Sequence, residues 1–262
     1  MITSFKAIVI RELLRFLHQR ERFLAALVRP LVWLFIFGAG FRAALGLSII
    51  PPYETYIRYE TYIVPGLCAM IVLFNAMQSS LSMVYDREMG SMRLLLTAPV
   101  PRWWILLAKL VASAFVSVLQ CIVFLAIAYA FDIRMPPGGY IAALPALLLI
   151  GLMLAAMGLF LSSMITRLQN FAGVMNFVIF PMFFLSTALY PLWRMQENAP
   201  HIASVVEWNP FTYAIELVRF ALYQKLEFNA LIWVCTCTIG FFLLSLWGYD
   251  PRKSMFMRKV RE

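Results

Sequence analysis

The uncharged run Met135–Thr166, MPPGGYIAALPALLLIGLMLAAMGLFLSSMIT, decides the fold class of this 262-residue chain. Its 32 residues include no Asp, Glu, Lys or Arg, and a helix needs only about 20 apolar residues to cross the hydrocarbon of a bilayer. The run is apolar in every direction, whereas a barrel strand alternates apolar and polar positions over about ten residues. It therefore predicts a transmembrane helix.

Similar runs lie on both sides of this stretch, at 61–85, 110–131, 168–193 and 228–249. A sixth apolar stretch contains Arg29 and Arg42. Because a charge at the centre of a membrane helix costs roughly 2.5–3.5 kcal/mol, we expect these two side chains to reach opposite membrane surfaces. The pattern predicts an all-α integral membrane protein with six transmembrane helices, at 25–46, 61–85, 110–131, 140–166, 168–190 and 228–249.

Composition and charge agree with this class. The chain is 63% hydrophobic and 13% charged, against roughly 25% charged residues in an ordinary soluble domain. With the N-terminus inside, sixteen of the 22 lysines and arginines fall on the inner side, as the positive-inside rule expects. We therefore expect a multi-pass protein of a bacterial cytoplasmic (inner) membrane, with both termini cytoplasmic. The net charge of +9 reflects topology, and no nucleic-acid partner is expected.

Two segments outside the spans are amphipathic or aromatic. Residues 1–22 carry seven charges among regularly spaced apolar residues, which predicts an N-terminal amphipathic helix on the inner membrane surface, in contact with membrane lipids. It serves either as an anchor or as a gate or partner-docking element. The first outer loop repeats tyrosine every third residue, at Tyr53, Tyr56, Tyr59 and Tyr62. An aromatic belt at the water interface is expected there, with a surface for ring-bearing cargo as the alternative.

The inner loop after the second span is the most informative segment. It opens with Asp86, Arg87 and Glu88 and ends at the prolines of the sequence APVPR, residues 98–102. Prolines end a helix, and early acidic residues suit a helix N-terminus. The loop thus predicts a short cytoplasmic helix at 86–98, whose leucines could be covered by a soluble partner.

The segment 191–227 predicts helices on the outer side. Asn209-Pro210 is a capping residue followed by proline at the first helical position. The helix that follows is apolar nearly all round, and Glu216 and Arg219 are spaced to pair on one face. We expect an outer-leaflet, re-entrant helical hairpin before the last span.

No catalytic constellation accompanies these spans. The chain lacks a Gly-Lys pair and hence a phosphate-binding P-loop, and the few histidines leave intramembrane serines without a base. The four cysteines lack companions for a metal site. We expect no catalytic residue, metal or cofactor in this chain. An intramembrane lipid-modifying enzyme and a secondary transporter that does not use ATP remain the alternatives.

Uncharged polar residues occur within the predicted spans, at Asn75, Gln78, Gln120 and Asn176. Such side chains commonly form hydrogen bonds between membrane helices. They are also candidates for contacts to cargo or to a second copy of the chain. The glycine and alanine residues at 151, 155, 156 and 158 indicate close helix packing in the fourth span.

The inner loop and the Asn-Pro helix together resemble the permease subunit of an ABC-2 type (type V) ABC exporter. The resemblance covers the whole chain, 1–262, as a single ABC-2 transmembrane domain. It includes the Arg-Glu-x-Gly loop that ends in a proline motif. It also includes the stretch Asn-Pro-x-x-Tyr-Ala-x-x-x-x-Arg, which is matched by Asn209, Pro210, Tyr213, Ala214 and Arg219.

The resemblance implies a permease that moves an amphipathic, lipid-like, drug or glycan cargo out of the cytoplasm. It also implies two copies of a separate ABC ATPase, which bind ATP and Mg²⁺, and a second permease chain, as a homodimer. The helix at 86–98 becomes the coupling helix, which sits in a groove of the ATPase. The residues expected there are Asp86, Arg87, Glu88, Gly90, Arg93 and Leu95.

Overall fold

The computed structural model describes residues 2–18, 20–41, 51–54, 57–89, 101–165 and 167–249. The regular elements of these ranges are helices. They are α1 (Ile2–His18), α2 (Arg20–Phe41), α3 (Tyr59–Glu88), α5 (Arg102–Ala130), α6 (Pro137–Met164), α7 (Leu168–Phe184), α8 (Leu192–Asn198), α9 (Pro200–Trp208), α10 (Pro210–Leu222) and α11 (Phe228–Gly248).

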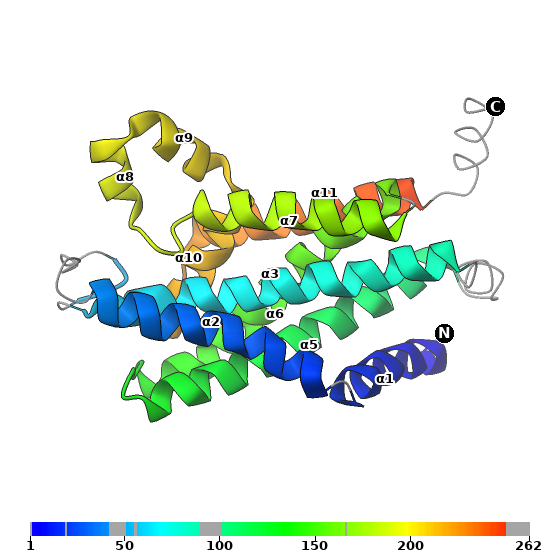
Figure 1. Cartoon of the computed structure of the whole chain (residues 1–262), viewed down its shortest axis with the longest axis horizontal. Coiled ribbons are helices and arrows are strands. Elements are labelled where there is room, and N and C mark those ends of the chain that lie inside the picture. Colours follow the sequence, from blue (N-terminus) through cyan, green and yellow to red (C-terminus); the bar gives the residue numbers. More distant parts are fainter. Residues whose placement is uncertain are drawn as a thin grey trace.

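The long helices run roughly along the longest axis of the molecule, and α8 and α9 stand out to one side of them, next to the end of α7 (Figure 1). The helices α3, α5, α6 and α11 are long and apolar enough to cross a membrane. The apolar segments of α2 and α7 are shorter. The described residues thus form the all-α fold of an integral membrane protein, while the number of six crossings remains a prediction.

Helix boundaries differ from the expected span boundaries at several places, three of which are described here. Helix α1 ends at His18 and α2 begins at Arg20, so the break comes before residue 22. Helix α7 ends at Phe184, because the segment 185–191 leaves the helix to pair with tyrosine side chains described below. Helix α3 continues through Asp86 to Glu88. The last part of the first predicted span, 42–46, lies outside the described residues.

Helix α6 is central and packs against α3, α5 and α11. Its glycines allow α5 and α3 to approach α6 closely, as predicted from the small residues of this span. A Cβ on Gly151 would lie 3.0 Å from the Cβ of Ala114 on α5, and a Cβ on Gly158 would lie 3.1 Å from the carbonyl oxygen of Ala76 on α3. The fourth predicted span is therefore the helix around which its neighbours assemble.

The polar residues of the spans have different surroundings. Asn75 on α3 donates to the carbonyl oxygen of Ser113 at 3.0 Å and to Ser117 Oγ at 2.8 Å, both on α5, as expected of an interhelical hydrogen bond. Gln120 is buried and Gln78 half-buried. Asn176 on α7 is exposed on the surface of the single chain.

The guanidinium of Arg29 lies against an aromatic ring of α3. Its Cζ lies 3.8 Å from the centroid of the Phe74 ring on α3. Phe74 is 15 residues after Tyr59 and 14 before Glu88, so the cation lies near the middle of the longest helix. The interaction with the ring face holds the side chain there.

Candidate functional site

The last turn of α3 carries three charged residues, and each contacts a different part of the chain. Asp86 Oδ2 lies 3.1 Å from Nζ of Lys109, near the start of α5. The Lys109 side chain is only 6% exposed, so the ion pair ties the end of α3 to α5 at a site with little solvent access.

Arg87 binds the end of α6. Its Nη1 donates to the carbonyl oxygens of Ser163 at 3.0 Å and Ile165 at 3.4 Å. These carbonyls lie at the C-terminus of α6, where a cation is favourable because of the helix macrodipole. The Arg87 Cζ also lies 4.9 Å from the centroid of the Tyr249 ring, and the Tyr249 hydroxyl is 2.7 Å from Ser162 Oγ. Arg87 therefore connects α3 with α6 and with the residue that ends α11.

Glu88 binds the start of α7. Its Oε2 accepts from the backbone N–H of Leu168 at 3.0 Å, and a carboxylate is favourable at a helix N-terminus. Arg87 and Glu88 thus place opposite charges on the two sides of the break between α6 and α7. One turn of α3 is joined to α5, α6, α7 and the end of α11, and we call Asp86, Arg87 and Glu88 the junction turn.

The junction turn differs from the helix start expected at Asp86. Asp86, Arg87 and Glu88 complete α3, because no helix-breaking residue precedes them and their charges find partners within the chain. Gly90, Arg93 and Leu95 lie outside the described residues, as does most of the predicted coupling helix at 86–98. The partners Ser163, Ile165 and Leu168 could not be predicted from the sequence, because they contribute backbone atoms.

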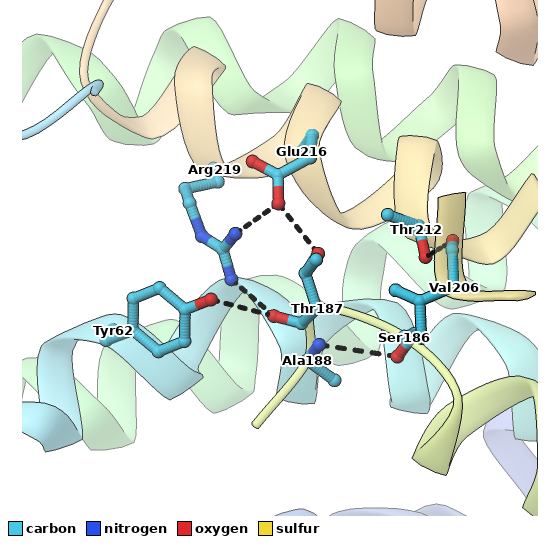
Figure 2. Close-up of polar contacts among 8 residues, drawn as sticks. All are labelled: Tyr62, Ser186, Thr187, Ala188, Val206, Thr212, Glu216 and Arg219. Atoms are coloured by element: carbon cyan, nitrogen blue, oxygen red, sulfur yellow. Dashed lines mark hydrogen bonds and ion pairs between the residues drawn. The ribbon is translucent and has the colours of Figure 1, made fainter. Parts of the chain in front are cut away.

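A second polar cluster lies at the opposite end of α3. Arg219 on α10 forms an ion pair with Glu216, three residues earlier, as expected. Its Nη2 donates to the carbonyl oxygen of Thr187 at 2.7 Å, and Thr187 Oγ1 donates to Glu216 Oε1 at 2.7 Å. Figure 2 shows this closed arrangement. The Arg219 side chain is only 3% exposed, so its charge depends on these partners.

The tyrosines before and at the start of α3 hold the segment after α7. The hydroxyl of Tyr62 donates to the carbonyl oxygen of Thr187 at 3.1 Å, and that of Tyr59 donates to the carbonyl oxygen of Leu189 at 3.1 Å. Tyr53 is also buried. The expected aromatic belt is therefore wrong for these three tyrosines, and their rings do not offer a stacking surface. Tyr56 lies outside the described residues.

The loop before α3 is fastened to the turn between α10 and α11. Lys225 Nζ lies 2.9 Å from Glu54 Oε1 and donates to the carbonyl oxygen of Pro52 at 3.0 Å. Its hydrogen bond lowers the pKa of Glu54. The Tyr53 ring packs edge-on against Tyr223, and burial raises the pKa of Tyr223 to about 12.

Asn209 joins α10 to the end of α7. Its Oδ1 accepts from the N–H of Phe211 at 3.0 Å, so it caps α10 as predicted, with Pro210 in the first turn. Its Nδ2 donates to the carbonyl oxygens of Met182 at 2.9 Å and Leu185 at 2.5 Å. Tyr213 stacks on Trp233 of α11 at 4.9 Å between ring centroids. The Asn-Pro helix is thus attached to both α7 and α11.

Replacing Gly66 of α3 by alanine should destabilise the fold by about 1–3 kcal/mol. An added Cβ would lie 2.6 Å from the carbonyl oxygen of Ala188, and backbone atoms cannot move aside cheaply. The matched control is Gly173→Ala on α7, where an added Cβ has no atom within 4 Å. Thermal unfolding in detergent should show a lower Tm for Gly66→Ala only; equal Tm values for both variants would refute the close packing.

The described residues bring no group of three or more His, Cys, Asp or Glu side chains together in a way that could hold a metal ion. An open, mostly apolar hollow of about 510 Å³ lies between α7 and α9. Its polar lining comes from Ser204 and Asn209, and the Asn209 amide is already bonded to α7. The hollow could therefore contact an apolar molecule, but it has few polar groups that could recognise a particular one.

The long apolar helices indicate a multi-pass helical membrane protein. Its polar clusters, including the junction turn, connect helices to one another. The family model of the ABC-2 type transporter matches residues 3–223, and the chain belongs to this family, as its sequence motifs indicated. Members of the family work in general with an ABC ATPase, and a permease subunit is generally not catalytic.

Named relatives agree with this assignment. The chain is 30% identical over 234 residues to the "Putative transport permease ycf38" of Pyropia yezoensis, covering 87% of this chain and 77% of the relative. It is 31% identical over 220 residues to the "Probable multidrug ABC transporter permease YbhR" of Escherichia coli K12, covering 79% of this chain and 55% of the relative. The chain is accordingly an ABC transporter permease.

Proposed function

We propose that this permease is the membrane subunit of an ATP-driven exporter in a bacterial cytoplasmic membrane, crossing it six times with both termini in the cytoplasm. Two permease chains, as a homodimer, assemble with two ATPase subunits that bind ATP and Mg²⁺. The cargo is amphipathic, and drugs, lipid-like molecules and glycans are all candidates. A relative named as a multidrug permease supports the drug class among them.

The junction turn is the observation that carries this proposal. It comprises the first three residues of the predicted coupling helix at 86–98 and is bonded to α5, α6 and α7 and to the end of α11. When ATP draws the two ATPases together, a push on the coupling segment would reach all of these helices through three side chains. Helices that move together in this way can open and close a pathway between two permeases.

Helix α1 and the exposed surface of α11 also agree with the proposed assembly. Phe5 of α1 packs on Trp104 of α5, with 5.1 Å between ring centroids. If the ATPase moves α1, this contact would transmit the movement to α5. Helix α11 exposes a series of large apolar side chains that lipid would cover. These are Phe228, Ile232, Ile239, Leu243, Leu244 and Trp247.

Purification tests the proposal most simply. The tagged permease, extracted in mild detergent from its own cells, should bring an ABC ATPase with it, and the complex in proteoliposomes should hydrolyse ATP and export cargo. The permease alone should do neither. Full transport by the isolated permease without a nucleotide-binding subunit would contradict the proposal and favour a secondary transporter.

A further inference from the structure

In the six-crossing arrangement proposed above, Arg29 places a cation near the middle of the bilayer. Phe74, whose ring lies under the guanidinium, is roughly 20 Å from either end of α3 at ~1.5 Å per residue. Within the described part of the chain, no carboxylate forms an ion pair with Arg29, and the side chain is exposed on the surface of the single chain. An ionised group at this depth normally faces a partner, a substrate or a water-filled space.

The residues around Arg29 come from three helices. Trp33, one turn further along α2, lies 5.6 Å and 5.8 Å between ring centroids from Phe183 and Phe184 of α7. The flank of α2 that carries Arg29 therefore meets α7, while α3 supplies Phe74.

One amide lies on the neighbouring flank of α7. Asn176 is seven residues before Phe183, so it lies on the face of α7 that meets Trp33, and it is exposed. We call the surface formed by Arg29, Trp33, Phe74 and Asn176 the Arg29 face. It combines one cation, one amide and two aromatic rings at a depth where lipid tails offer no polar partner.

We propose that the Arg29 face binds the anionic head group, a phosphate or carboxylate, of an amphiphilic molecule. This inference rests on the proposed export function and names the charge class of the cargo. A guanidinium offers forked donors that match both oxygens of a phosphate or carboxylate. The exposed amide of Asn176 supplies a further donor, and the aromatic rings and the exposed apolar side chains of α7 accompany the apolar tail.

The test uses two fluorescent probes with the same pyrene-labelled dodecyl tail, one ending in phosphate and one in trimethylammonium. Binding is measured to the full chain in phosphatidylcholine nanodiscs. The wild type should bind the phosphate probe at least tenfold more tightly. Arg29→Gln should weaken phosphate binding at least tenfold, or about 1.4 kcal/mol, without weakening binding of the ammonium probe. Arg29→Lys should retain part of the preference, because it keeps the charge.

The matched control is Arg134→Gln, whose guanidinium is exposed and pairs with Asp132 at 3.0 Å; it should keep the full preference. An equal preference in wild type and Arg29→Gln, or an equal loss in Arg134→Gln, would overturn the proposal. Failure of an ATPase to co-purify would instead count against the exporter and leave this binding comparison standing.

Two further measurements distinguish exported cargo from a resident membrane lipid as the occupant of the site. Release of the bound phosphate probe on addition of ATP to the complex identifies exported cargo. Displacement of the probe by phosphatidylglycerol in the nanodisc, without release by ATP, identifies a resident membrane lipid. Either result supports an anion site at Arg29.

Discussion

Glu216→Leu is expected to lower the free energy of unfolding by about 3 kcal/mol, because it leaves the guanidinium of Arg219 buried without a counter-charge. Arg219 is 3% exposed, and its remaining partner for Nη2 is the carbonyl oxygen of Thr187. The cluster holds α10 against the segment after α7, so its loss should loosen this end of the fold. Thermal unfolding in detergent, followed by tryptophan fluorescence, measures the effect.

The double variant Glu216→Leu/Arg219→Met is the control for this interpretation. Replacing both members of a buried ion pair by apolar residues is commonly neutral or nearly so, so the double variant should recover more than half of the loss. A double variant that is less stable than Glu216→Leu would show that the isolated charge was not the cause.

Arg87→Glu is expected to reduce cargo-stimulated ATP hydrolysis at least tenfold while the protein still folds and binds its ATPase. The substitution sets a carboxylate against the carbonyl oxygens of Ser163 and Ile165, where a negative charge is unfavourable. The end of α3 would then separate from α6, and motion of the coupling segment would no longer reach that helix. The measurement is ATP hydrolysis by the reconstituted complex with and without cargo.

Two variants accompany this measurement. Arg87→Lys keeps a positive donor and should retain a substantial part of the stimulation. Arg134→Glu reverses an exposed charge in the turn between α5 and α6 and should retain all of it. Normal stimulation in Arg87→Glu would rule out the junction turn as the route of coupling.

Features that depend on neighbouring residues could be predicted from the sequence. The apolar helices follow from runs long enough to cross hydrocarbon. The cap at Asn209 and the pair Glu216–Arg219 follow from spacing along one helix, and both are present. The small residues of α6 likewise predicted close packing, which Gly151 and Gly158 provide.

Features that depend on long-range contacts with the backbone could not be predicted. Arg87, Glu88 and Tyr62 bond to main-chain atoms 76 or more residues away, and every residue offers such atoms, so no residue type marks the partner. Arg29 was expected at the membrane surface because transfer costs favour it there. The ring of Phe74, against which its guanidinium lies, belongs to another helix and is supplied by the packing of α2 on α3.

The account depends most on the inner location of the segment that follows the junction turn. Met89, which is 64% exposed at the end of α3, can be replaced by cysteine in a variant that lacks the four native cysteines. A membrane-impermeant maleimide should label Met89→Cys in inside-out vesicles and leave it unlabelled in intact cells, while Asp132→Cys should show the reverse. Labelling of Met89→Cys from the outside of intact cells would contradict the account.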